Sequence, residues 1–243
     1  VYIMSTAGGE GEVLTSAKEG VDLFKWDRDS RGITFISKDS LTADEESRNK
    51  AKDDERTLDE NTKYARLYRT EMATRITLLL TPENENISDF DYAPDGSQLV
   101  CVIASSPKSD DIYYRGKLIV MNRDGSARKC ISEKTLGYVK WSPLGDQILH
   151  YTFKGKTLAG LPELVSPYDG KIKPLGDDYV GTIWDMDWIP DTRDLFVSSQ
   201  EGVQGIVGSL NTVTGKLKSM RSMGRKHSWE MSGSVSADGK WVA

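Results

Sequence analysis

The residues that could perform chemistry in this chain are few and lie far apart. Its 243 residues include two histidines, His150 and His227. A serine-hydrolase triad needs a nucleophile, a histidine base and an acidic residue that orients the base. His150 lies in an apolar run and is typical of a structural position, whereas His227 follows Arg225-Lys226 in a basic loop. No serine is placed to pair with either histidine, so we assign no catalytic residue.

The nucleophile elbow of α/β-hydrolases, Gly-x-Ser-x-Gly, is also missing. The nearest stretch, Gly233-Ser234-Val235-Ser236-Ala237, lacks the second glycine and falls where we expect a turn between strands. A zinc site would need three or four His, Cys or acidic ligands at short spacing, and that spacing is absent. We therefore predict no metal and no cofactor-binding residue. Cys101 and Cys130 are expected to be free buried thiols, on strands of one repeat that a third strand separates.

The elements that would position any site repeat along the chain. An apolar run ends in an anchor residue, a turn rich in Pro, Asp or Gly follows, and a second apolar run begins. The anchors are spaced by 66, 49, 47 and 47 residues; they are Trp26, Tyr92, Trp141, Trp188 and Val235. Pro presets φ, Asp bonds to its own backbone and Gly accepts positive φ, so these segments favour tight turns. Short strands at a period of roughly 40–50 residues are typical of a β-propeller.

A second column of turns includes Arg123-Asp124-Gly125, Tyr168-Asp169-Gly170 and Val213-Thr214-Gly215, whose glycines are 45 residues apart. Each repeat therefore holds four antiparallel strands, which is one propeller blade. The sequence predicts an all-β propeller over residues 1–243, with about five blades' worth of strands. Its expected parts are a partial blade over 1–19, full blades over about 20–83, 84–134, 135–179 and 180–225, and a partial blade over 226–243.

The two ends leave two interpretations open. The chain begins at Val1 inside an expected strand, so we expect a true N-terminus to precede it, and it ends after the second strand of a blade. Either the chain is a piece of a larger ring of seven or eight blades, or the two end pairs join into one mixed blade that closes a five-bladed ring. Open sheet edges promote aggregation, so a stable isolated chain would favour closure.

The first repeat is the longest because of a charged insertion over residues 38–63. Between Ala43 and Glu60, twelve of eighteen residues are charged, and Leu58 is the only large apolar residue. Thr42 and Glu45 fit a capping box, so a helix can begin there. Without an apolar face it cannot pack deeply, and we expect an exposed helix or a mobile loop on the rim, with docking of a partner as the alternative.

Two groups of residues invite functional interpretation at the centre of the predicted propeller. Acidic residues ahead of strands, namely Asp22, Asp89, Asp185 and Asp187, would face a central channel, where carboxylates in some propeller hydrolases bind calcium. Aspartate is also a routine turn residue, so this signal is weak. The aromatic anchors would form a stacking surface for a ligand, but their regular place at strand ends favours packing between blades.

Composition excludes some classes of protein. The chain is 37% hydrophobic and 28% charged with a net charge of −5, which is ordinary for a soluble protein. No Lys/Arg-rich stripe appears, which argues against a nucleic-acid partner. No apolar run approaches the roughly 18 residues that span a membrane. Nothing distinguishes a cytoplasmic from a periplasmic location.

The residues also resemble a known family. Tyr2-Ile3-Met4 through Gly8-Gly9, and the Trp-x-Pro-Asp-Gly-like turns, resemble TolB-like, WD40-like repeats. The chain is most similar to the N-terminal propeller of prolyl oligopeptidase family serine peptidases, of the acylaminoacyl-peptidase and dipeptidyl-peptidase-like branch. The stretches that carry this likeness are Lys52–Tyr68, Leu79–Gly96 and Gly116–Pro143. Asp29-Ser30, Leu144-Gly145 and Asp191-Thr192 depart from the Asp-Gly of the family's turns.

This resemblance implies a function without catalysis in this chain. In the family, an α/β-hydrolase domain of the same polypeptide carries the Ser-Asp-His triad, and the propeller restricts access to short or unstructured peptides in transit. The chain is therefore expected to be a propeller that docks on a hydrolase domain and gates the access of substrates to it. That domain is not found in this sequence, and the parent protein would be a serine peptidase. The alternative is a TolB-like module for protein–protein interaction with no enzyme attached. A third interpretation, a small-molecule or calcium-dependent propeller enzyme, predicts a metal in the channel.

Overall fold

A computed structural model describes residues 1–53, 55, 61–153, 160–176, 179–224 and 233–242. Four sheets of four antiparallel strands follow one another along the chain. They comprise β3 (Leu23–Trp26), β4 (Gly32–Lys38), β5 (Ala65–Glu71) and β6 (Thr77–Leu79); β7 (Asn86–Tyr92), β8 (Gln98–Ala104), β9 (Gly116–Asn122) and β10 (Lys129–Thr135); β11 (Val139–Trp141), β12 (Ile148–Phe153), β13 (Gly160–Val165) and β14 (Ile172–Pro174); and β15 (Thr182–Trp188), β16 (Asp194–Glu201), β17 (Gln204–Asn211) and β18 (Leu217–Gly224).

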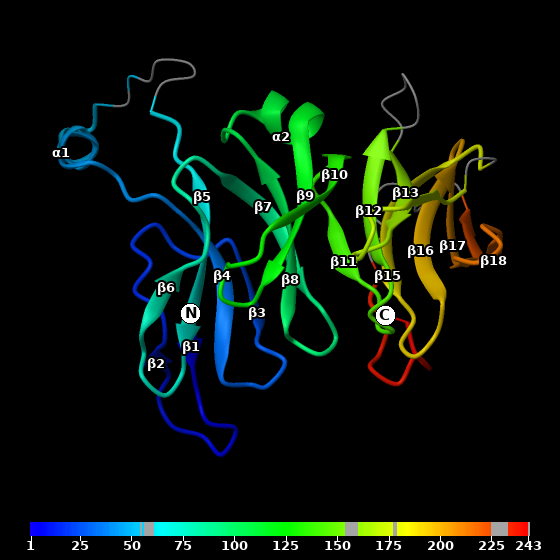
Figure 1. Ribbon diagram of the computed structural model, residues 1–243, viewed down its shortest axis with the longest axis horizontal. Helices are drawn as coiled ribbons and strands as arrows, with labels where there is room; N and C mark the ends of the chain where they lie inside the picture. Colours follow the sequence, from blue (N-terminus) through cyan, green and yellow to red (C-terminus); the bar gives the residue numbers. More distant parts are fainter. Residues whose placement is uncertain (54, 56–60, 154–159, 177–178, 225–232, 243) are drawn as a thin grey trace.

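Within each sheet the strands lie in chain order, so each pairs with the next. The sheets stand side by side in an arc (Figure 1). A short pair, β1 (Tyr2–Ile3) and β2 (Glu12–Val13), precedes them, and a single bridge joins Val235 to Val242 after them. The prediction of an all-β fold built from four-stranded antiparallel propeller blades is confirmed.

Apolar residues fill the spaces between neighbouring sheets. β8 alternates between the two sides: Leu99, Cys101 and Ile103 pack with residues of β5, whereas Val100 and Val102 pack with Val139 and Trp141 of the next sheet. Because both faces of the strand are covered, an unbroken apolar run is the pattern that the position requires.

Tight turns gather at one end of the sheets. The turn after β7 places Gly96 at φ +70°, and the corresponding turn after β3 places Ser30 at φ 58°. Ser30 thus stands where the Asp-Gly pattern has glycine, and the backbone keeps the same left-handed conformation. That conformation is less favourable for serine than for glycine, because serine has a Cβ.

The opposite end carries the longer connections, including both helices (Figure 1). α1 (Ala43–Ala51) connects β4 to β5; it has the predicted capping box of Thr42 with Glu45 and no buried residue. Lys63 lies 2.6 Å from Glu45, and its ammonium is the main reason that the pKa of this half-buried carboxyl falls to about 2. The prediction of a solvated helix is confirmed for the described part of the insertion; Leu58 lies outside the described residues.

α2 (Ser109–Arg115) connects β8 to β9 and was not predicted. Its N-cap, Lys108, forms no side-chain capping hydrogen bond, so the sequence carries no capping signal there.

Cys101 is buried and Cys130 is exposed, and neither forms a disulfide. β9 separates their strands as predicted, but the expectation of a buried Cys130 is wrong because β10 is the outer strand of its sheet. No helix in the described part of the chain is long and apolar enough to cross a membrane.

Candidate functional site

The first strands β7, β11 and β15 converge on a cavity of about 370 Å³, which the turn after β3 reaches through Arg28. We call it the channel-mouth cavity. It lies where these strands end and the tight turns begin, and each four-stranded sheet, or a turn within it, contributes to its wall. Its lining residues include Arg28, Asp91, Lys140, Trp141, Asp187 and Trp188.

Charged residues of alternating sign lead into this cavity. They occupy the position immediately before each of the first four anchors: Lys25, Asp91, Lys140 and Asp187. Nζ of Lys25 lies 2.8 Å from Oδ1 of Asp91, and Nζ of Lys140 lies 3.6 Å from Oδ1 of Asp187. Each ion pair joins one sheet to the next. We call these residues the inner charged row.

The two ion pairs differ in how freely a ligand could reach them. Asp91 is nearly buried and also accepts a hydrogen bond from the backbone N–H of Trp141 at 2.8 Å. Lys140 and Asp187 keep 33% and 38% of their side chains exposed. The lysine of the looser pair is therefore an accessible cation of the cavity wall, together with Arg28, which is exposed. Sequence reasoning missed both lysines, although their position before the anchors was a usable signal.

The aspartates that were expected to face a channel have separate structural tasks. Asp89 Oδ2 accepts from the N–H of Val139 at 3.0 Å, and burial raises the pKa of its carboxyl. Asp185 Oδ2 accepts from the N–H of Gly233 at 3.0 Å. Both carboxylates thus join a first strand to the segment that follows in the next blade. Asp22 lies apart from them, 3.9 Å from Lys38 on the surface.

These aspartates form no metal-binding group. Among the described residues, no three His, Cys, Asp or Glu side chains are grouped so that they could hold a metal ion. The geometry around the inner charged row gives no support to the calcium interpretation.

The aromatic anchors pack between sheets at three of four positions. Tyr92, Trp141 and Trp188 are 1–6% exposed, in agreement with the packing interpretation. Trp26 departs from it, since 46% of its surface is exposed. The Nε1 of Trp141 donates to the carbonyl of Gly145 at 3.2 Å, whereas the Nε1 of Trp188 is buried without a hydrogen-bond partner.

His150 lies in β12, fully buried, as predicted for a structural position. Its Nδ1 donates to the carbonyl of Tyr151 at 3.2 Å, and its Nε2 has no hydrogen-bond partner. Burial lowers its pKa to about 4, so it is a neutral imidazole near pH 7. His227 lies outside the described residues. Ser236 is in the predicted turn, where its hydroxyl donates to Asp238 at 2.6 Å. No serine–histidine pair arises among the described residues.

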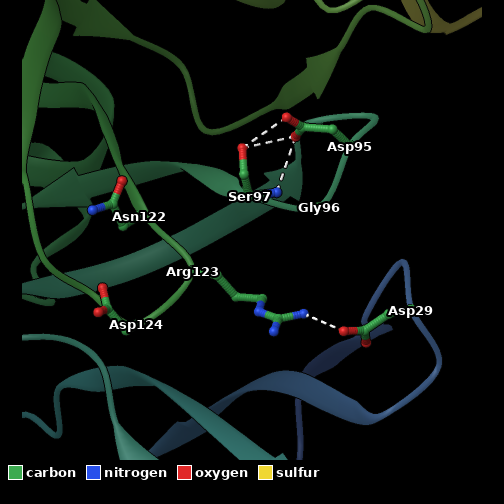
Figure 2. A pocket seen from close by; sticks show the side chains of 7 residues that line it. All are labelled: Asp29, Asp95, Gly96, Ser97, Asn122, Arg123 and Asp124. Carbon is green, nitrogen blue, oxygen red and sulfur yellow. Dashed lines mark hydrogen bonds and ion pairs between the residues drawn. The ribbon is translucent and has the colours of Figure 1, made fainter.

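A larger cavity of about 500 Å³ opens between the turns of the first two four-stranded sheets (Figure 2). Arg123 spans it to Asp29 at 2.7 Å. The other carboxylates are engaged within their own turns: Asp95 accepts from the N–H of Ser97, and Asp124 accepts from Ser126. This cavity is therefore a gap between turns that are each stabilised internally, and we assign no ligand to it.

Comparisons with known proteins place the fold among propellers. Neither a family model nor a curated protein matches the chain. Among solved structures, oligogalacturonate lyase from Vibrio parahaemolyticus matches with a TM-score of 0.72 and 14% identity, over 99% of this chain and 62% of that one. TolB from Acinetobacter baumannii matches at 0.63 and 15%, over 99% and 52%. A prolyl endopeptidase matches at 0.67 and 14%, over 98% and 33%.

The chain therefore has the propeller fold that occurs in TolB and in the prolyl endopeptidases. It spans between about a third and two thirds of the length of these three structures. At these identities the likeness concerns the fold, and a function has to be argued from the cavity and its residues.

Proposed function

We propose that this chain is the non-catalytic propeller of a prolyl-oligopeptidase-like serine peptidase, which docks on a hydrolase domain and admits short, unstructured peptides to it. One observation carries the proposal: the channel-mouth cavity. Residues of the second, third and fourth four-stranded sheets and Arg28 of the turn after β3 line it, and Lys140 and Asp187 leave both a cation and an anion accessible in its wall. A peptide offers carboxylate, ammonium and backbone groups to such a pair.

The comparison with the prolyl endopeptidase supports this choice, because 98% of the chain aligns with only a third of that enzyme.

The difference between the two ends of the sheets also supports the proposal. Long connections, which commonly carry function, gather at the end that bears α1 and α2. On α2, Tyr113 and Tyr114 remain more than half exposed, and Tyr114 stacks on Phe153 with ring centroids 5.7 Å apart. We propose this end as the docking face.

The proposal predicts peptide binding without peptide cleavage. An unstructured peptide of about ten residues, titrated into the protein, is expected to change the emission of Trp141 and Trp188, which line the cavity. Lys140→Ala is expected to weaken binding several-fold. Lys216→Ala is the matched control, since Lys216 is exposed in the turn between β17 and β18, outside the cavity lining.

A serine-directed fluorophosphonate probe tests the non-catalytic part. We expect no labelling and no peptide hydrolysis above background. Robust hydrolysis that the probe abolishes would overturn it. Equal binding by the wild type and Lys140→Ala, with specific capture of a folded protein, would instead favour the TolB-like interaction module.

A further inference from the structure

The turns that follow the five anchors place equivalent residues around the channel-mouth cavity. In each of these turns, the residue two positions after the anchor lines the cavity. Three of these residues are prolines, and the full set is Arg28, Pro94, Pro143, Pro190 and Ala237. Arg28 is the one charged member of this set. The turn after β3 therefore brings a cation to a position that the next three turns fill with an apolar ring.

The base of Arg28 is held in place, whereas its charge is unpaired. A Cβ added at Gly96 would lie 2.9 Å from the Cβ of Arg28, so the arginine packs closely against the turn after β7. The residue is exposed, and its guanidinium forms no ion pair with any residue that the structure describes. Arg123, on a neighbouring turn, differs because it pairs with Asp29 at 2.7 Å. Arg28 is thus an anchored cation whose charged group is free to bind a ligand.

The turn after β15 departs from the others in the opposite sign. Elsewhere, the aspartate three positions after the anchor accepts a hydrogen bond from the backbone N–H two residues later, at 2.9–3.2 Å; these aspartates are Asp29, Asp95 and Asp238. The corresponding Asp191 is itself the left-handed residue of its turn, at φ 59°. The N–H of Asp194 donates instead to Oγ1 of Thr192 at 3.1 Å.

The carboxylate of Asp191 is therefore not used by its own turn. The residue is exposed, and among the described residues it has no hydrogen-bond or ion-pair partner for its side chain. It lines the same cavity as Arg28. The remaining charged residues of the lining are already paired, Asp91 with Lys25 and Lys140 with Asp187.

The two exceptions give the cavity an unpaired charge of each sign. Arg28 comes from the first four-stranded sheet and Asp191 from the fourth, and two other sheets stand between them in the arc (Figure 1). The volume of about 370 Å³ falls within the range of roughly 300–1,000 Å³ that is typical of sites for small ligands. A ligand that satisfies both charges carries an anion and a cation that are separated from each other.

We propose that the channel-mouth cavity binds short peptides whose two ends are both free. Arg28 pairs with the terminal carboxylate, which a guanidinium can bind through two parallel hydrogen bonds, and Asp191 pairs with the terminal ammonium. Pro94 and Pro143 lie between them in the row of turns and have no backbone N–H that would compete for the carboxylate. The inference rests on the proposed function and narrows it, because an internal segment of a longer chain has neither terminal charge.

Calorimetric titration of trialanine into the protein tests this proposal, with the C-amidated and the N-acetylated peptide as chemical counterparts of the two residues. We expect free trialanine to bind at least fivefold more tightly than either blocked form. Arg28→Ala should weaken binding of the free peptide at least fivefold and leave the affinity for the amidated peptide unchanged. Asp191→Asn should do the same with respect to the acetylated peptide, since groups that contact each other have non-additive effects.

Arg31→Ala and Asp110→Asn are the matched controls, because both residues are exposed and lie outside the cavity lining. Both variants should bind free trialanine as the wild type does. Arg28→Pro is the second variant at its position, since it removes the charge and gives this turn the residue that three other turns have. Circular dichroism shows whether each variant keeps its strands.

Equal binding of free and blocked trialanine overturns the proposal, and so does a loss in Arg28→Ala that is as large for the amidated peptide. Tighter binding of the amino acid alanine, whose two charges share one carbon, would overturn it and identify a free amino acid as the ligand. A ten-residue peptide with both ends blocked separates this proposal from the proposed function. If that peptide binds in a Lys140-dependent manner while trialanine does not bind, the recognition of free ends fails and the reception of peptides stands. If neither peptide binds, both fail.

Discussion

A buried hydrogen-bond network between the first two four-stranded sheets gives the sharpest test of how the blades are held together. The hydroxyl of Tyr92 donates to Oδ1 of Asp27 at 2.6 Å, and Thr34 lies 2.6 Å from the same hydroxyl. Arg69 donates to Oδ2 of Asp27, whose side chain is fully buried. Burial, followed by the Asp27 carboxylate, raises the pKa of the Tyr92 phenol, so it stays a donor.

Tyr92→Phe keeps the ring and removes only the hydroxyl. A hydrogen bond to a charged group contributes about 1.5–3 kcal/mol and a neutral one about 1 kcal/mol. Asp27 keeps Arg69, so its charge remains paired, but its Oδ1 loses this donor. We therefore expect the free energy of unfolding to fall by about 2–4 kcal/mol. Asp27→Ala, which leaves the arginine without its buried carboxylate, should cost about 3–5 kcal/mol.

Urea unfolding followed by circular dichroism measures both changes, with m-values compared to check that the transition is the same. Tyr114→Phe is the matched control, because that ring is 63% exposed; surface changes of this kind stay within about 0.5 kcal/mol. A Tyr92→Phe cost as small as that of Tyr114→Phe would refute the view that this network joins the blades.

Three further predictions concern other parts of the fold. Burial lowers the pKa of His150 from 6.5 to about 4, so as the pH falls the unfolded chain binds a proton at this residue before the folded chain does. The free energy of unfolding should therefore fall between pH 6.5 and 4 by up to about 3 kcal/mol. His150→Gln should lack this pH-dependent loss of stability. Gly125→Ala should cost about 1–3 kcal/mol more than Gly215→Ala because of overpacking. Both glycines have positive φ, so backbone strain is common to the two variants, but only at Gly125 would a Cβ meet a backbone oxygen, that of Leu80, at 2.6 Å. Thr42→Ala should reduce helicity in α1 by loss of its cap and leave the urea midpoint unchanged, because α1 buries no residue.

Each of these has a contrary outcome. Identical pH profiles of unfolding for the wild type and His150→Gln would remove the buried imidazole as a source of acid lability. Equal costs for the two glycine variants would mean that the contact relaxes freely. A lowered midpoint for Thr42→Ala would show that α1 supports the sheets.

Local patterns in the sequence were enough for the blades and for α1. Turn residues at fixed offsets and short apolar runs depend only on neighbours in the chain, and the capping box of Thr42 and Glu45 is a local signal of the same kind. α2 carries no such signal, because Lys108 caps nothing with its side chain.

The exposure of residues and the pairing of charges were harder to predict. Trp26 shares the sequence position of Trp141, yet its burial depends on which strands lie beside it. The attachment of Lys25 to Asp91, 66 residues apart, requires two first strands to align across a blade boundary. Such alignments involve non-local contacts, which local patterns in a single sequence do not specify.

Photo-crosslinking tests the central claim, that the channel-mouth cavity receives unstructured peptides, most directly. A short unstructured peptide with a photoreactive residue at its centre is irradiated with the protein, and the attachment sites are mapped by mass spectrometry. We predict attachment at the cavity lining, with Trp141, Lys140 and Trp188 foremost, and none when the same peptide is closed into a rigid disulfide loop. Attachment spread over the outer strands, or equal attachment of the closed peptide, would contradict the account.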